Sequence, residues 1–258
     1  MTHAATESSE QSTHTAALRR VSASGFRGAH AGKLFLGGAL AGFALLCALV
    51  LLLHHLDLVI FRGQVLFGET AQWQLGLKWL GLALLFVLAQ EAMLRGYLQY
   101  ALTRLFTWLL RRCGLTDLAL PIGFGIGAAV LSSLAALAQL RGGHSPIGIV
   151  NVFLFGLLLA YSLWRTGSLW WATGFHLMWN WAQSFVWGVP SSGLPTHDRL
   201  FLTEPIGDVL RSGGATGPEG SVYMLGALVA AFGIVSLLHP RRVYHDLWAE
   251  AARDDRIR

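Results

Sequence analysis

Two pairs of polar residues interrupt apolar stretches of this sequence, and each pair has the spacing of one helical turn. Glu91 and Arg95 are four residues apart, as are His176 and Asn180, so the members of each pair share a helix face. An arginine can hold a carboxylate in place, a neutral histidine can act as a base or a ligand, and an amide can support an oxyanion. Each pair can equally be structural, as an ion pair or a polar clamp between helices.

Two glutamines, Gln90 and Gln139, also lie late in apolar stretches. A glutamine forms hydrogen bonds but does not exchange protons near neutral pH, so a hydrogen bond between helices is the stronger interpretation of both. A zinc site takes three or four His, Cys or carboxylate ligands. The apolar stretches offer only Glu91 and His176, and His144 lies just outside one of them. Spacing alone therefore predicts no metal site.

The elements that must position these residues are membrane-spanning helices. Charged residues make up 13% of the 258-residue chain and hydrophobic residues 54%, whereas soluble domains carry about 25% charged residues. The apolar residues occur in long runs, and a spanning helix needs about 20 of them. The sequence therefore predicts an all-α polytopic membrane helix bundle with about six transmembrane helices. The expected spans are about 34–53, 75–102, 119–140, 147–164, 168–188 and 222–238.

Three further features complete the expected organisation. Residues 103–112 are amphipathic and predict a short interfacial helix. Residues 119–140 are rich in small side chains, which let helix backbones approach closely in lipid. The connection at 189–221 is rich in glycine and proline, which predicts turns. The expected domains are a disordered cytoplasmic tail (1–32), a transmembrane bundle (33–240) and a basic cytoplasmic tail (241–258).

The basic residues lie between the apolar runs. The formal net charge is +5, but this placement is typical of topology determinants. Most arginines fall in segments that share one side of the membrane if both termini are cytoplasmic. We therefore predict cytoplasmic termini, the lipid bilayer as surroundings and no nucleic-acid partner.

The two polar pairs and their neighbours resemble motifs of a known family. The run from Gln90 to Gly96 (QEAMLRG) resembles E-E-x-x-x-R-G, the first motif of the CAAX protease and bacteriocin-processing (CPBP, or Abi) family. The run from His176 to Asn180 (HLMWN) resembles its later motif, H-x-x-x-N/D. Residues 213–221 are similar to a segment that follows this motif in many bacterial members. The resemblance covers about 34–240 and implies a multi-helix intramembrane protease.

The resemblance also implies roles for individual residues. In the family, the first Glu of E-E-x-x-x-R and a His in a middle F-x-x-x-H motif activate water, and the later His and Asn support the oxyanion. It thereby implies that Glu91, Arg95, His176 and Asn180 are the retained catalytic positions. A divalent metal such as zinc would follow from the family's metalloprotease label only. The implied partner is a membrane-embedded or membrane-proximal peptide or protein substrate, and the implied location is a bacterial inner membrane.

Two catalytic positions depart from the family pattern. Gln90 stands where the first Glu is expected, and Gln139 and Ala135 replace the His and Phe of F-x-x-x-H. General-base assistance contributes about 10²–10⁴-fold, and an amide cannot supply it. We therefore expect impaired or absent peptide hydrolysis, as in a pseudoprotease. Two alternatives stay open: an active variant protease that uses Glu91 and His176, and a non-enzymatic membrane binding or immunity factor.

Overall fold

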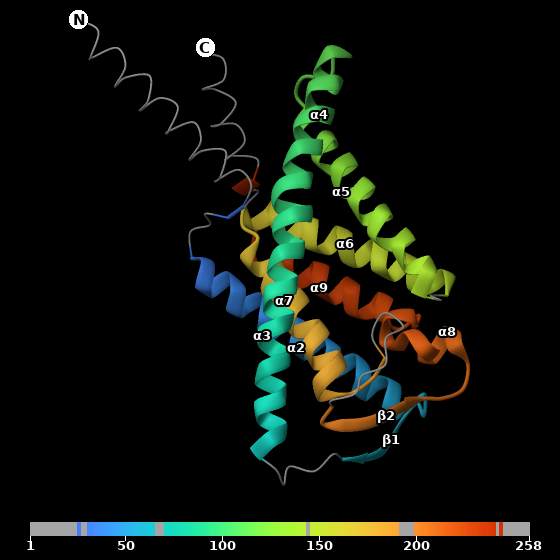
Figure 1. The fold of residues 1–258 in the computed structure, drawn as a ribbon. Coiled ribbons are helices and arrows are strands. Elements are labelled where there is room, and N and C mark those ends of the chain that lie inside the picture. Colours follow the sequence, from blue (N-terminus) through green and yellow to red (C-terminus); the bar gives the residue numbers. More distant parts are fainter. Residues whose placement is uncertain are drawn as a thin grey trace, which may run out of the picture.

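The computed structural model describes residues 25–26, 30–64, 70–142, 145–190, 199–240 and 243–244. Long helices form a bundle, and two short strands lie at one end of it (Figure 1). This confirms the all-α class. In chain order the elements are α2 (Ala31–His55), β1 (Val59–Gln64), α3 (Thr70–Glu91), the π-helix η1 (Ala92–Leu98), α4 (Gln99–Arg112), α5 (Ala119–Ala138), the 3-10 helix η2 (Gln139–Gly142), α6 (Pro146–Thr166), α7 (Trp170–Trp181), the π-helix η3 (Ala182–Val186), β2 (Phe201–Pro205), the single turn α8 (Val209–Ser212), the 3-10 helix η4 (Gly214–Gly220) and α9 (Met224–Leu238).

Five helices within the described residues are long and apolar enough to cross a membrane, so the protein is an integral, multi-pass membrane protein. The sequence predicted about six. The difference lies at the predicted span 168–188, which forms α7 followed by η3 and is shorter than the other five. α7 packs against α2, α3 and α6, and most of its side chains are buried. Its neighbours therefore cover it, and it does not need the length of a lipid-facing span.

The second predicted span and the predicted interfacial helix form one long helix. α3, η1 and α4 continue without a break, and the 39 residues from Gln74 to Arg112 make one apolar helix. Figure 1 shows this helix crossing α2, α6 and α9 at a large angle, while α5 runs back from its α4 end. The prediction of a separate helix over 103–112 was wrong. No glycine or proline lies between Tyr97 and Arg112 to end the helix.

Backbone-to-backbone contact joins α2 to α7. Gly38 and Gly42 form a G-x-x-x-G pair on α2, and Gly174 faces them from α7. A Cβ atom at Gly38 would collide with the carbonyl oxygen of Trp171, and one at Gly174 would collide with that of Phe35. Small residues at such positions are the usual means of close helix packing in membranes. This contact fixes the helix that carries His176.

The small residues of α5 make a similar contact with α4, as the sequence predicted. A Cβ atom at Gly123 would lie 2.7 Å from Oγ1 of Thr107, and one at Gly127 would lie 3.2 Å from Nε2 of Gln99. The Gln99 amide then donates to the carbonyl oxygen of Phe124 at 2.9 Å. This buried hydrogen bond fixes the register of the two helices.

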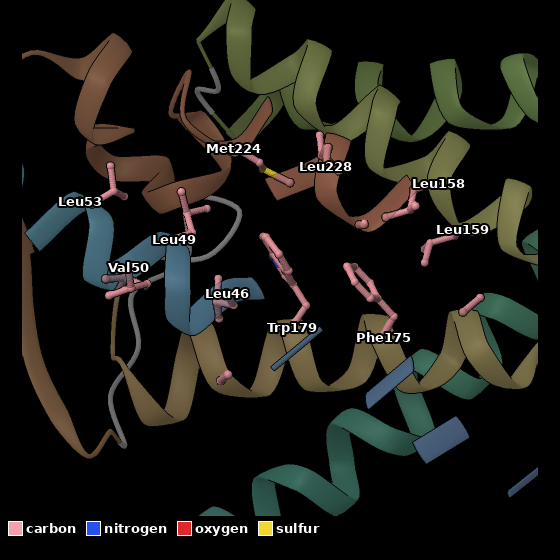
Figure 2. Close-up of a cluster of buried hydrophobic side chains, with 14 of the residues drawn as sticks. Leu46, Leu49, Val50, Leu53, Leu158, Leu159, Phe175, Trp179, Met224 and Leu228 are labelled. Atoms are coloured by element: carbon pink, nitrogen blue, oxygen red, sulfur yellow. The ribbon is translucent and has the colours of Figure 1, made fainter. Parts of the chain in front are cut away.

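The largest apolar cluster lies where α2, α6, α7 and α9 meet. Figure 2 shows side chains from all four helices directed into this region. The rings of Trp171 and Trp179 stack on Phe175 with centroids 5.0 and 5.8 Å apart. These tryptophans are therefore packing residues and not interfacial anchors. The labelled members are Leu46, Leu49, Val50, Leu53, Leu158, Leu159, Phe175, Trp179, Met224 and Leu228.

A small sheet and a glycine-rich segment close one end of the bundle. β1 and β2 pair antiparallel, with Val59 opposite Pro205. The glycine-rich part of the predicted turn region forms η4, in which Gly217 has a φ of 71°. The side-chain amide of Asn151 on α6 donates to the carbonyl oxygens of Glu219 and Ser221, each at 2.8 Å. The turn prediction thus missed the strand and the helical turns, which these tertiary contacts stabilise.

At the opposite end, Arg165 joins α6 to α9. Its guanidinium donates to the carbonyl oxygens of His239 and Ser236 at 2.6 and 2.9 Å. Further along, Tyr244 is buried against Phe124, with ring centroids 4.9 Å apart. The predicted tail 241–258 is therefore attached to the bundle at Tyr244. Residues 245–258, and residues 1–24 of the other predicted tail, lie outside the described residues.

His239 gives the protein a pH-dependent stability. Burial, and then the charge of Arg165, lower the pKa of His239 below its usual value. The unfolded chain therefore takes up this proton first as the pH falls, and stability decreases below about pH 6.5. We expect the melting temperature of the purified protein to drop between pH 7.5 and 5.5, and the drop to be smaller in His239→Gln. Equal drops in both proteins would contradict this assignment.

Candidate active site

A buried ion pair lies at the junction of α3 and η1. Glu91 is the last residue of α3, and Arg95 lies one turn later within the π-helix. Nη1 of Arg95 donates to Oε1 of Glu91 at 3.0 Å, and both side chains are almost fully buried. The structure thus confirms that the two residues share a helix face. Because the charges neutralise each other, this helix can hold them inside an apolar bundle.

His176 joins this pair from α7. Its Nδ1 lies 2.8 Å from Oε1 of Glu91, the same oxygen that Arg95 contacts. An ionised carboxylate only accepts hydrogen bonds, so Nδ1 of His176 is the donor in this contact, and Nε2 is the ring nitrogen that does not contact Glu91. The ring of Phe155 on α6 lies edge-on to the imidazole, with centroids 5.5 Å apart. The imidazole is therefore held from two sides.

A second contact fixes α3 against α7. Nε1 of Trp181 donates to the carbonyl oxygen of Gly76 at 3.0 Å. A Cβ atom at Gly76 would lie 2.5 Å from the ring of Phe185, so α3 also touches η3, which follows α7, closely there. This contact and the Glu91–His176 contact lie about four turns apart on α3. Together, the two contacts fix α3 against α7 and hold Glu91 within hydrogen-bonding distance of His176.

Two buried acceptors, on Glu91 and on the residue before it in the chain, have no hydrogen-bond partner within the described residues. They are Oε2 of Glu91 and Oε1 of Gln90. A buried polar atom without a partner costs about 1–3 kcal/mol, and such atoms are rare in folded proteins. His176 retains 12% exposure of its side chain, so the site is accessible at this residue. Oε2 of Glu91 can therefore accept a further hydrogen bond beside His176.

The other predicted site residues are less closely associated. Asn180 is half-buried and follows His176 by one turn on α7. Gln139 begins η2, after the end of α5. α5 packs on α4 and α6 and runs away from α3 (Figure 1). The structure therefore brings together Glu91, Arg95 and His176, with Asn180 beside them, and it separates Gln139 from this group.

Both helices that carry the site change to π-helical geometry next to it. η1 begins immediately after Glu91 and contains Arg95, and η3 begins two residues after Asn180. π-helical segments are rare and occur frequently at functional sites. Sequence periodicity missed both of them, because one wider turn hardly changes the apolar pattern. The contributions of Phe155 and Trp181 were missed too, because each depends on a contact with a distant helix.

The donor set does not fit a zinc ion. The described residues contain no group of three or more His, Cys, Asp or Glu side chains that could hold a metal. Glu91 and His176 are the two side chains at this site that could bind a metal, and Oε1 of Glu91 already accepts a hydrogen bond from Arg95. A guanidinium 3.0 Å from the carboxylate also opposes a second positive charge there. His144 lies outside the described residues.

The bundle and its site define a multi-pass membrane protein with a buried carboxylate–imidazole pair. In a comparison with known families, residues 71–182 match the family described as Type II CAAX prenyl endopeptidase Rce1-like. The matched part contains all six predicted site positions and runs from α3 to the start of η3. Over these residues, the match confirms the resemblance to the CPBP family. No curated protein and no solved structure matches the chain.

Proposed function

We propose that this CAAX-protease-like protein binds the backbone of a membrane-embedded or membrane-proximal peptide and hydrolyses it poorly or not at all. One observation carries the proposal: Oε1 of Glu91 is engaged by both Arg95 and His176, while the neighbouring position is the amide Gln90. The carboxylate is thus used to hold other side chains. The location we propose is a bacterial inner membrane, on the family resemblance.

The binding mode follows from the unpartnered acceptors. Oε2 of Glu91 and Oε1 of Gln90 are buried and can accept hydrogen bonds from the N–H groups of an extended peptide. The side-chain amide of Asn180 can donate to a peptide carbonyl oxygen beside His176. These contacts offset the cost of bringing peptide polar groups into the bundle. Binding therefore does not require the missing base.

Hydrolysis requires a group that takes a proton from water. Gln90 cannot do so, and Gln139 lies in an element that runs away from the site. His176 contacts Glu91 through Nδ1, so its Nε2 is the remaining candidate base. Loss of one general base typically costs about 10²–10⁴-fold in rate. We infer that the site retains the oxyanion side of the family mechanism and lacks most of the water-activating side.

A second candidate function rests on the Glu91–His176 contact. A carboxylate that accepts a hydrogen bond from one nitrogen of a histidine ring fixes the tautomer of that ring. It also orients the other nitrogen toward a reacting group. The 2.8 Å separation provides this arrangement. In this alternative, His176 alone activates water, Glu91 orients it, and the protein is an active variant protease. A purely binding role as an immunity factor would share the peptide contacts of the first proposal.

The deciding experiment compares peptide binding and cleavage by detergent-purified proteins. A broad peptide library, including prenylated CAAX peptides, is presented to wild type, Gln90→Glu and His176→Ala. His55→Ala is the matched control, since His55 is exposed in the last turn of α2. We expect wild type to bind peptide without turnover above the His176→Ala background, and Gln90→Glu to gain about 10²-fold or more.

Other outcomes separate the alternatives. Repeated turnover by wild type that His176→Ala abolishes and His55→Ala retains would establish the active variant protease. Binding by wild type with no gain in Gln90→Glu would favour a binding or immunity role. Absence of both binding and cleavage would overturn the proposed function.

A further inference from the structure

The last two turns of the long helix carry a basic face with an aromatic ring in it. Arg104, Trp108, Arg111 and Arg112 have the spacing i, i+4, i+7 and i+8, which places them on one side of α4. All four are exposed. The guanidinium of Arg112 lies over the ring of Trp108, 4.4 Å from its centroid. The opposite face of α4 is buried against α5 through Thr103 and Thr107.

Packing against α5 places this basic face at one edge of the apolar layer. Gly127 lies against Gln99, and Gly123, one turn earlier on α5, lies against Thr107. The two helices are antiparallel, so the start of α5 lies beside the last turn of α4. α5 is an apolar helix of 20 residues, about the thickness of the hydrocarbon core. Its first residues, and the arginines beside them, therefore lie at the headgroup level.

The length of the helix supports the same placement. Its 39 residues extend about 58 Å, whereas the hydrocarbon core is about 30 Å thick. The helix therefore extends beyond the core, and in Figure 1 its α4 end projects at one end of the bundle, beside the start of α5. Leu105 and Leu109 are exposed beside the basic face and can reach acyl chains. Tryptophan beside arginine is typical of the membrane–water interface.

The charges on this face of α4 indicate which class of lipid it would bind. Between Gln99 and Leu118 the chain has three arginines and one acidic residue, Asp117, in the loop that follows α4. Most other basic residues suggest that this end faces the cytoplasm, and the cytoplasmic leaflet is anionic. We propose that Arg104, Arg111 and Arg112, with Trp108, form a binding site for the phosphate headgroups of anionic lipids. The site anchors the cytoplasmic end of the helix that carries Glu91.

Lipid titration of the intact protein tests this site independently of hydrolysis. Purified protein in neutral detergent is titrated with phosphatidylglycerol or phosphatidylcholine, and bound lipid is counted by native mass spectrometry. Arg111→Gln/Arg112→Gln is compared with Arg62→Gln/Arg211→Gln, which removes the same charge from the opposite end of the bundle. A third variant, Arg111→Lys/Arg112→Lys, keeps the charge.

Each arginine near the surface is worth about fivefold in affinity, so the first double variant should bind phosphatidylglycerol about 30-fold more weakly than wild type. The opposite-end variant and the lysine variant should stay within about fivefold of wild type, and 0.5 M NaCl should weaken binding. Equal losses in the two glutamine variants, or equal binding of phosphatidylcholine, would overturn the proposal. Full competition by inorganic phosphate would also overturn it, because a free anion would then suffice.

Discussion

Glu91→Gln should lower the free energy of unfolding by about 3–5 kcal/mol, the usual cost of removing one partner from a buried ion pair. The reason is the position of Arg95, whose side chain is 7% exposed and contacts Oε1 of Glu91 at 3.0 Å. With a neutral amide at position 91, the guanidinium would stay buried without a counter-charge. Unfolding of the purified protein in detergent, followed by tryptophan fluorescence, measures this loss.

An exposed ion pair in the same chain provides the control. Arg62 and Glu204 are separated by 2.8 Å, and both side chains are more than half exposed. Glu204→Gln should cost at most about 1 kcal/mol. Replacing both buried partners, in Glu91→Leu/Arg95→Met, should recover most of the stability lost in Glu91→Gln, because no charge is then left buried. Similar losses in the two single variants would show that burial of the Glu91 pair has no special energetic role.

Gly38→Ala should cost about 3 kcal/mol, at the upper end of the usual range for overpacking. The added methyl group would meet the carbonyl oxygen of Trp171, and backbone atoms cannot move aside as a flexible side chain can. α2 and α7 must then separate, which also disturbs His176 one turn further along α7. The unfolding midpoint in detergent measures the cost, and peptide binding measures the effect on the site.

The neighbouring glycine makes a strict comparison for this substitution. Gly37 lies in the same helix turn, but a Cβ atom there would meet nothing within 4 Å. Gly37→Ala should therefore leave stability unchanged or raise it by up to about 1 kcal/mol, because alanine loses less chain entropy than glycine. If Gly38→Ala is as stable as Gly37→Ala, the two helices are not in the close contact described above.

Sequence patterns predicted the bundle well because each span has a strong local signal. The composition and long apolar runs indicated the spans, and the four-residue spacings placed Glu91 with Arg95 and His176 with Asn180 on shared faces. The contact between Glu91 and His176 joins α3 to α7, and no local pattern encodes such a distance. The family resemblance, which assigns both motifs to one catalytic site, was the only indication of it.

Features that depend on contacts between distant segments were not predicted. The pairing of β1 with β2 was not predicted: residues 201–205 lie in the region predicted to form turns, and no element was predicted over 59–64. Each strand is short and is ordered by pairing with the other. The displacement of Gln139 from the site follows from the direction of α5, which the packing of Gly123 and Gly127 sets. The apolar periodicity of a sequence predicts which face of a helix is buried. It does not predict the angle at which two packed helices cross.

The pairing of β1 with β2 also has a consequence for biogenesis. About 140 residues separate the two strands in the chain, and the elements that carry the site, α3, η1 and α7, lie between them. At synthesis rates of about 5–20 residues per second, β1 is made about 7–28 s before its partner. The sheet can therefore form only after α3 to α7 have been synthesised. Its closure would mark a late step in assembly, and a pulse-labelled chain that stops short of β2 should lack it.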